Sequence, residues 1–327
     1  MSDYKPYFKN KNVLVTGYEG FLGSNLTKEL ISLGANVCGI DILTKRKNTL
    51  LAGLFDKINI INGSVEDYDL LAKIIKENNI EIIFHLAAKS LVNDALLGPK
   101  EAFSTNIAGT WNVLEASRKS GSVKSVVAAS SDKAYGIHNK LPYKEDACLL
   151  GSYPYDASKS CADILSSTYF KTYGLNVCVT RCGNIYGPGD FNFSRIVPDA
   201  TRCAIESKTL TIRSDGKFTR DYIYVKDIVS AYFLLAMKME GGKLAGEAFN
   251  FSDENPVSVL KLVKAVYKAA GRQNADYKIM NTARCEIRHQ YLSAAKAGKI
   301  LKWKPVYSFG SGLSETINWY RDYLKGA

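Results

Sequence analysis

The stretch ASSDKAYG, residues 129–136, follows an apolar run and brings an acid and an amine side by side. Ser131, Asp132 and Lys133 can each hydrogen-bond or move a proton. Burial raises the pKa of a carboxyl group and lowers the pKa of an amine, so it would prepare this pair for general acid and base catalysis. The alternative interpretation is a structural ion pair at the end of a strand.

Tyr155 and Lys159 form a second pair, four residues apart in the segment GSYPYDASKSCAD. On a helix this spacing places both side chains on one face. A neighbouring ammonium group lowers the pKa of a tyrosine, so the phenolate could abstract a proton near neutral pH. The spacing alone is common on helix surfaces, so the pair is informative only together with other motifs.

A glycine-rich loop in VLVTGYEGFLGSNL supplies the third motif, with Gly17, Gly20 and Gly23 between an expected strand and an expected helix. Glycines allow the backbone to approach a pyrophosphate, and the helix N-terminus adds amide donors and a favourable dipole. Asp41 ends the next expected strand, where a carboxylate accepts the ribose hydroxyls of NAD and repels the 2′-phosphate of NADP. We therefore predict NAD as the cofactor, although the basic residues 45–47 could tolerate that phosphate.

The elements that must position these motifs alternate regularly in the first half of the chain. The expected strands are residues 12–16, 37–40, 58–61, 82–86, 125–129 and 175–180, and the expected helices are 21–33, 68–77, 99–119 and 155–173. Such alternation predicts a parallel sheet covered on both faces. Further helices are expected near 197–207, 225–239, 257–270 and 313–323, where the pattern is less regular.

We predict an α/β fold with a Rossmann-like doubly wound parallel sheet and a smaller C-terminal α/β substrate lobe. Residues 1–183 are expected to bind NAD and to carry the catalytic residues, and residues 184–327 to bind the substrate, with the two lobes interleaved at the boundary.

Composition excludes several other classes of protein. The net charge of +11 is spread along the chain without a basic run that contains aromatic residues, so we expect no nucleic-acid partner, while a basic balance suits a dianionic substrate. The seven cysteines form no CxxC pair, so neither a disulfide framework nor a metal site is expected. No apolar stretch approaches the roughly 20 residues of a membrane span, and the polar start lacks a signal core. We expect a cytoplasmic protein without a membrane partner.

Taken together, the glycine loop, Asp41, Ser131, Tyr155 and Lys159 resemble the short-chain dehydrogenase/reductase superfamily, whose catalytic unit is Ser or Thr, Tyr and Lys. The second lobe makes the chain similar to the extended branch, which modifies nucleotide sugars. The segments that match this branch are FHLAAKS, NIAGTWNVLEA, TRCGNIYGPGD, FTRDYIYVKDIVSA and ILKWKP. The resemblance covers nearly the whole chain.

The resemblance implies a set of binding residues. Those implied for the cofactor are Gly17, Gly20, Phe21, Leu22, Gly23, Asp41, Ile42, Ser64, Val65, Leu86, Ala87, Ala88, Lys89, Asn106, Tyr155, Lys159, Cys182 and Ile185. Those implied for the substrate are Ser90, Ser131, Asn184, Arg195, Ile196, Val197, Arg220 and Arg288, the two last as ligands of the diphosphate. Ser64-Val65 departs from the branch's usual acidic-hydrophobic pair, so a weaker adenine contact is expected.

Within this branch, the residues after Ser131 resemble those of 4,6-dehydratases. An Asp-Lys pair is similar to CDP-glucose 4,6-dehydratases and to some UDP-N-acetylglucosamine 4,6-dehydratases, whereas dTDP-sugar dehydratases carry Asp-Glu. The segments SSDKAY, PYDASKSCAD and RCGNIYGPGDFNFSRIVPD are also similar to the CDP-glucose enzymes. The segment FTRDYIYV departs from them, which bears on the nucleotide more than on the chemistry.

The resemblance implies a net dehydration. Tyr155 would take the proton of the C4 hydroxyl as NAD oxidises C4, Lys133 would take the C5 proton, and Asp132 would protonate the departing C6 hydroxyl. A 4-epimerase or decarboxylase on the same fold, which leaves Asp132 and Lys133 idle, is one alternative, and a non-catalytic NAD-sensing protein is another. The branch also implies a homodimer, joined by helices 99–119 and 155–173 in a four-helix bundle.

Overall fold

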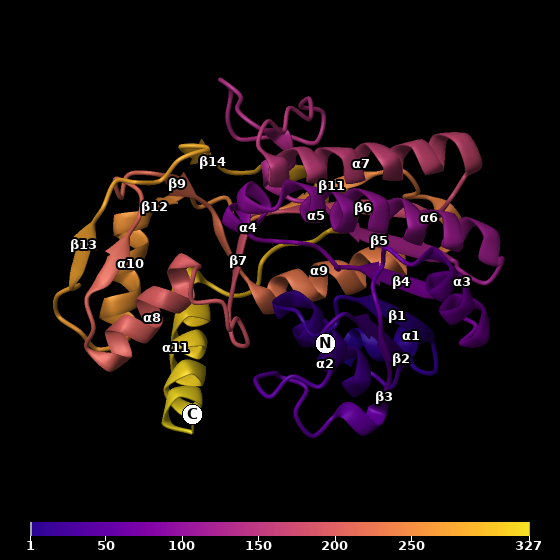
Figure 1. Cartoon of the computed structure of the whole chain (residues 1–327), viewed down its shortest axis with the longest axis horizontal. Coiled ribbons are helices and arrows are strands. Elements are labelled where there is room, and N and C mark those ends of the chain that lie inside the picture. Colours follow the sequence, from indigo (N-terminus) through magenta and orange to yellow (C-terminus); the bar gives the residue numbers. More distant parts are fainter. Residues whose placement is uncertain (1, 327) are drawn as a thin grey trace.

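The larger part of the structure, a computed structural model that describes residues 2–326, is a parallel sheet (Figure 1). Its seven strands lie in the order β11-β6-β5-β4-β1-β2-β3, and every neighbouring pair is parallel. The strands are β1 (Asn12–Thr16), β2 (Asn36–Asp41), β3 (Ile58–Asn62), β4 (Ile82–His85), β5 (Ser125–Ala129), β6 (Val177–Cys182) and β11 (Ala248–Phe251). The sheet is therefore doubly wound, as predicted, and its strand order reverses between β1 and β4.

Helices cover both faces of this sheet because its strands are apolar on both sides. Val13 and Val15 of β1 pack into one core and Leu14 into the other, since successive side chains of a strand alternate. Figure 1 shows α6 and α7 on one side of the strands and α2 and α9 on the other. The covering helices are α2 (Phe21–Ser32), α3 (Tyr68–Glu77), α6 (Gly109–Ser120), α7 (Pro154–Tyr173) and α9 (Val225–Lys238).

The helix expected over residues 99–119 is not one regular helix. It consists of α5 (Pro99–Phe103), a π-helical turn η3 (Ser104–Ala108) and α6. Single π turns inside helices occur often at functional sites. Here the turn carries Asn106, which is buried against the loop that follows β4.

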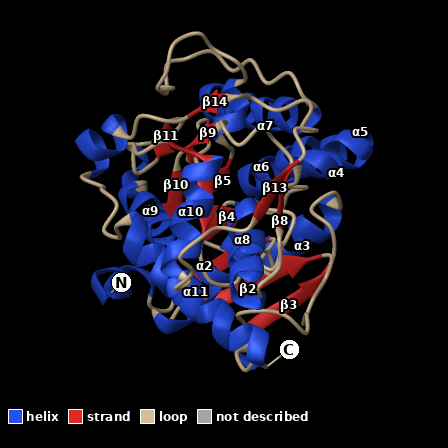
Figure 2. Cartoon of the chain, turned by 90° about the vertical axis from the view of Figure 1, so that its left-hand side faces the viewer, coloured by secondary structure: helices blue, strands red, loops and turns tan. Residues whose placement is uncertain are grey.

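The smaller lobe faces the viewer in Figure 2 and packs beside the carboxyl ends of the main strands. Its helices are α8 (Ile196–Glu206), α10 (Val259–Ala269) and α11 (Phe309–Lys325), and its strands are β7 (Asn184–Tyr186), β8 (Leu210–Ile212), β9 (Thr219–Arg220), β10 (Tyr222–Tyr224), β12 (Val257–Ser258), β13 (Tyr277–Ile279) and β14 (His289–Gln290). The remaining short elements are η1 (Ser2–Tyr4), α1 (Lys5–Phe8), η2 (Phe55–Lys57), α4 (Val92–Leu97), η4 (Asp132–Tyr135), η5 (Glu240–Gly242) and η6 (Ala297–Leu301).

The two lobes exchange segments of chain. Strand β11 pairs with β6 at the edge of the main sheet, and α9 packs against α2. Both β11 and α9 come from the part of the chain after residue 184, yet they belong to the larger lobe. The division into residues 1–183 and 184–327 stays a prediction. The exchange of β11 and α9 means that the two lobes do not correspond to two continuous stretches of chain.

Candidate active site

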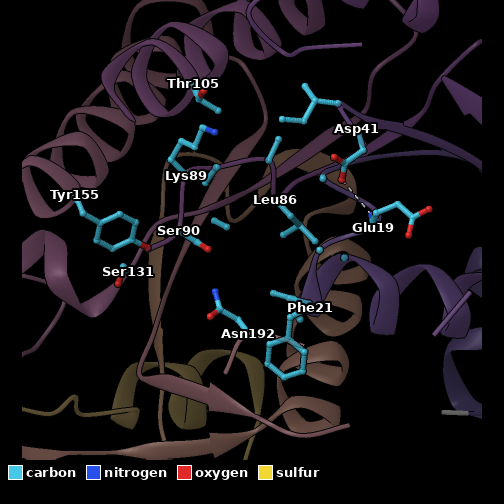
Figure 3. Close-up of a pocket in the computed structure, with 18 of the residues that line it drawn as sticks. Glu19, Phe21, Asp41, Leu86, Lys89, Ser90, Thr105, Ser131, Tyr155 and Asn192 are labelled. Atoms are coloured by element: carbon cyan, nitrogen blue, oxygen red, sulfur yellow. Dashed lines mark hydrogen bonds between the residues drawn. The ribbon is translucent and has the colours of Figure 1, made fainter. Parts of the chain in front are cut away.

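A cavity of about 1030 Å³ lies at the carboxyl ends of the central strands, where doubly wound sheets bind their ligands. Figure 3 shows Asp41 and Glu19 at one end of it and Tyr155 and Ser131 at the other. The predicted site residues that line it are Gly17, Gly20, Phe21, Leu22, Gly23, Asp41, Ile42, Ser64, Val65, Leu86, Ala87, Ala88, Lys89, Ser90, Ser131, Asp132, Lys133, Tyr155, Cys182, Asn184, Ile185 and Arg195. Residues from both lobes thus share one cavity, and their individual roles stay predictions.

Two predicted residues lie behind the cavity wall. Asn106 accepts a hydrogen bond from the Lys89 amide (2.8 Å) and donates to the Lys89 carbonyl and the Ser158 hydroxyl. The Lys159 ammonium donates to the carbonyl oxygen of Ala129 (2.8 Å), the last residue of β5. Both side chains therefore hold the backbone that forms the wall.

Four predicted substrate residues are not in the cavity lining, namely Ile196, Val197, Arg220 and Arg288. Val197 is buried in the first turn of α8. The Arg220 guanidinium donates to the backbone carbonyls of Thr219, Ile287 and Arg288. Arg288 is exposed, with its guanidinium 5.9 Å from the centre of the Phe218 ring. The structure therefore brings Arg195 to the cavity but holds the other two arginines beside it.

The glycine loop fits a dinucleotide because its glycines have no side chains that would keep a pyrophosphate away from the backbone. A Cβ atom at Gly23 would lie 2.1 Å from the carbonyl oxygen of Gly17, and Gly17 has a φ of +71°. Helix α2 begins at Phe21 after Gly20, with no side chain capping its first amides. Those amides and the helix dipole remain available to a pyrophosphate.

Asp41 ends β2 as predicted, and its carboxylate is fixed from two sides. It accepts hydrogen bonds from the amides of Glu19 (3.3 Å) and Leu43 (3.2 Å). Burial raises its pKa, and the Arg46 guanidinium lies 4.0 Å away. Glu19 and Arg46 were not predicted as site residues, yet both line the cavity. An acid inside the glycine triplet was the signal that could have indicated Glu19.

Tyr18, the residue after the first glycine of the loop, packs into the hydrophobic core. Tyr18 is fully buried, and its ring lies over Gly39 of β2. A Cβ atom at Gly39 would lie only 2.6 Å from Cγ of Tyr18. The ring therefore occupies space that any side chain at position 39 would need.

At the other end of the cavity, Ser131 organises the residues after β5. Its hydroxyl donates to Oδ1 of Asp132 (2.9 Å) and accepts from the amide of Lys133 (3.2 Å), which starts the short helix η4. The Tyr155 hydroxyl points at Ser131 in Figure 3, and a hydrogen bond with Ser131 lowers its pKa. The Ser131 hydroxyl thus lies next to both Asp132 and Tyr155, two other groups that can move protons.

The Asp132–Lys133 pair has pKa values shifted in the directions that acid and base roles require. Burial raises the pKa of Asp132, which is only 5% exposed. Burial also lowers the pKa of Lys133, and the charge of Arg220 lowers it further. Arg220 belongs to β9 of the smaller lobe, so this charge acts on Lys133 across the boundary between the two lobes.

Tyr155 does not have the lowered pKa that its spacing from Lys159 suggested. Burial raises the pKa of Tyr155 to about 12, and burial lowers the pKa of Lys159 to about 8. The charges that act on Tyr155 are Arg195, which lowers its pKa, and Asp132 and Asp156, which raise it. The Lys159 ammonium, which was expected to lower the pKa of Tyr155, donates instead to the carbonyl oxygen of Ala129.

Asp156 is a second acid beside the pair, and it was not among the predicted site residues. It is 1% exposed, and its Oδ1 has no hydrogen-bond partner among residues 2–326. Burial raises its pKa to about 6, and Lys133 is the first of the groups that lower it. Its position between Tyr155 and Lys159 in YDASK was the available signal.

A buried ion pair positions η4. Arg181 of β6 binds Asp163 of α7 through two hydrogen bonds of 2.7 and 2.8 Å. Arg181 also donates to the hydroxyl of Tyr135, the last residue of η4, and that hydroxyl donates to Asn250 of β11. The helix that carries Tyr155 and the turn that carries Asp132 are therefore both tied to β6 through the Arg181 guanidinium.

The histidine and cysteine side chains give no further catalytic or metal-binding group in the described residues. His85 lies between the hydroxyls of Thr16 and Thr110, and burial lowers its pKa to about 3. All seven cysteines are free. Within residues 2–326, no three His, Cys, Asp or Glu side chains are grouped to hold a metal ion. No helix in this part of the chain is long and apolar enough to cross a membrane.

Comparison with known proteins gives consistent matches. Residues 13–251 match the NAD dependent epimerase/dehydratase family. CDP-glucose 4,6-dehydratase of Salmonella typhimurium is 29% identical, over 98% of this chain and 94% of that protein. The structure of dTDP-glucose 4,6-dehydratase from Bacillus anthracis in complex with NAD has a TM-score of 0.85 at 29% identity, covering 96% of this chain and 98% of that one. UDP-glucose 4-epimerase from Thermotoga maritima with UDP-glucose has a TM-score of 0.87 at 30% identity, covering 96% and 99%.

These matches confirm the family resemblance, the Rossmann-like fold and NAD as the cofactor. They also establish an enzyme of the extended short-chain dehydrogenase/reductase type, in the class of nucleotide-sugar 4,6-dehydratases and epimerases. The chain belongs to the NAD dependent epimerase/dehydratase family.

Proposed function

We propose that the chain dehydrates a nucleoside diphosphate hexose, with CDP-glucose as the expected substrate, to the 4-keto-6-deoxyhexose. The observation that carries this proposal is the Asp132–Lys133 pair, which lines the cavity within reach of Ser131 and Tyr155 and has pKa values shifted towards a neutral acid and a neutral amine. An epimerase needs neither group, so their placement favours elimination.

The side chains divide the proton transfers between them. When bound, NAD supplies the oxidant for C4 of the sugar and gives the same electron pair back at C6. Tyr155 accepts the proton of the C4 hydroxyl, Lys133 takes the proton of C5, and Asp132 protonates the departing C6 hydroxyl. Lys133 then returns a proton to C5, and water has been removed overall.

Arg195 is the arginine best placed for the substrate diphosphate. Its guanidinium lines the cavity, donating to Asp190 (3.1 Å) and to the Ser90 hydroxyl (3.1 Å). Arg220 could join it only by leaving its carbonyl partners, and the exposed Arg288 lies outside the cavity lining. Cytidine is the expected base because the Salmonella relative that spans 98% of this chain acts on CDP-glucose.

The test is incubation with CDP-, UDP-, dTDP- and GDP-glucose, followed by mass spectrometry. A product 18 mass units lighter than CDP-glucose, with the alkaline absorbance of a 4-keto sugar, is expected. Conversion of UDP-glucose to its 4-epimer without mass change would contradict the proposal. The likeness to the Thermotoga maritima UDP-glucose 4-epimerase makes that epimerase activity the second candidate function.

We also propose a homodimer through α6 and α7, in the cytoplasm. These helices pack against each other, and each presents a large apolar side chain to solvent, Trp111 (46% exposed) and Ile164 (54% exposed). Leu114 of α6 is in the core of the subunit and does not belong to this surface. Light scattering should give twice the mass of the 36.1 kDa chain, and Trp111→Lys should reduce it to the mass of one chain.

A further inference from the structure

The proposed dehydration does not return the enzyme to the protonation state from which it started. Each turnover gives Tyr155 the proton of the C4 hydroxyl and takes a proton from Asp132 for the leaving water. Lys133 gains a proton from C5 and returns one to the same carbon, so it ends as it began. The electron pair taken from C4 is returned at C6, so the turnover leaves no net oxidation or reduction. Tyr155 therefore ends with one proton too many and Asp132 with one too few.

We propose that Ser131 is a proton relay that resets the enzyme after each turnover, by passing its own hydroxyl proton to Asp132 while it receives one from Tyr155. This inference rests on the proposed dehydratase function. Two O–H bonds break and two form, one at Asp132 and one at Ser131. The pair of Tyr155 and Asp132 keeps the same number of protons, so no exchange with bulk water is needed.

The geometry already has the order of donors and acceptors that the relay needs. The Ser131 hydroxyl donates to Oδ1 of Asp132 at 2.9 Å, so its proton points at the group that must be refilled. The hydroxyl of Tyr155 points at Ser131 (Figure 3). The Lys133 amide donates to the Ser131 oxygen at 3.2 Å, which fixes that oxygen between the two groups.

Burial explains why a relay through protein is favoured over exchange with water. Asp132 and Tyr155 are 5% and 8% exposed. Burial raises the pKa of Asp132, which favours arrival of the proton there, but it also raises the pKa of Tyr155. The shift from Tyr155 to Asp132 therefore costs free energy, and the reset should contribute to the steady-state rate.

The experiment compares the first turnover with later ones in Ser131→Ala, using CDP-glucose and the NAD-loaded enzyme. Without the hydroxyl, the first turnover can proceed from correctly protonated enzyme, but the reset must wait for solvent. We expect a burst of about one product per site, then a steady state about 10²-fold slower, the lower range for loss of a general acid–base group. Small buffer acids should restore the later turnovers, and Ser131→Thr, which keeps a hydroxyl, should show no burst.

A second measurement does not depend on rates. Infrared difference spectra before and after a single turnover should show that Ser131→Ala loses a carboxylic-acid carbonyl band and does not regain it, while the native enzyme does. Asp132→Asn identifies the band. Equal slowing of first and later turnovers in Ser131→Ala, or no rescue by buffer, overturns the relay. If the native enzyme dehydrates none of the four nucleotide sugars, the proposed function fails, and the relay fails with it because epimerisation creates no such imbalance.

Discussion

The two ends of the cavity use different parts of the chain, backbone at the cofactor end and ionisable side chains at the catalytic end. At the cofactor end, bare backbone and one fixed carboxylate do the binding: Gly17 and Gly23 leave no room for side chains, and two amides hold Asp41. At the catalytic end, buried ionisable side chains converge from η4, α7 and the smaller lobe, and each shifts the pKa of the next. Backbone geometry is local in sequence, whereas the electrostatics of the catalytic end exist only in the assembled fold.

The largest effect should come from Tyr155→Phe, which tests whether the catalytic end starts the reaction. Without the hydroxyl, the C4 proton cannot leave, so both C4 oxidation and dehydration should fall by about 10⁴-fold, the upper range for a general acid–base group. Stopped-flow absorbance of reduced cofactor and mass spectrometry measure the two steps. Tyr153→Phe is the matched control, since Tyr153 precedes the same helix but does not line the cavity.

Changing Asp132→Asn together with Lys133→Met should separate elimination from oxidation. Dehydration should fall by about 10²–10⁴-fold, while oxidation at C4 persists and near-ultraviolet absorbance of reduced cofactor accumulates. With Asp132→Asn alone, deuterium from solvent should still enter C5 because Lys133 remains as the base. Near-native dehydration by the double variant would mean that the pair is structural and would favour the epimerase or decarboxylase alternative.

At the cofactor end, Asp41→Ala should weaken NAD binding by about 10- to 100-fold, the value of hydrogen bonds to a charged group. The loss should be smaller for NADP, because Asp41 no longer repels its phosphate while Arg46 remains at 4.0 Å from the former carboxylate position. Calorimetry with both dinucleotides measures the difference. Asp69→Ala, an exposed acid on α3 outside the cavity, is the control, and unchanged NAD affinity in Asp41→Ala would contradict the assignment.

The last prediction concerns stability at the catalytic end rather than a rate or an affinity. Burial raises the pKa of Asp156 to about 6, so the folded state holds this proton more tightly than the unfolded state does. Asp156 therefore favours folding at low pH, and this contribution is lost as the pH rises through about 6. Relative to the native protein, Asp156→Asn should gain at most about 3 kcal/mol of unfolding free energy between pH 4 and pH 8.

Urea unfolding of both proteins at several pH values measures this difference, with Asp69→Asn as an exposed control. A difference that does not change between pH 4 and pH 8 would show that Asp156 titrates normally. The electrostatic contrast between the two ends of the cavity would then be smaller than described.

Local signals were enough to predict most of the fold and the cofactor end. β1, β5 and α3 begin and end at the expected residues, because hydrophobic periodicity is a property of neighbouring positions. The π turn around Asn106 was not predictable in this way, since its reason is a contact with Lys89. Arg220 and Asp156 were not predicted as neighbours of Lys133 for the same reason: YDASK places Asp156 on the catalytic helix, but no local pattern indicates which buried charges will face each other.

Tyr18 and Gly39 illustrate how such contacts constrain the way this sequence can change over time. The ring of one residue fills the space that a side chain on the other would require. Gly39 cannot accept even an alanine while Tyr18 stays, whereas a small residue at position 18 would make position 39 permissive but leave a void until it was filled. Gly39 can therefore change only after position 18 has changed, and the effect of a mutation at position 39 should depend on which residue stands at position 18. This dependence would be measured as epistasis across a double-mutant cycle.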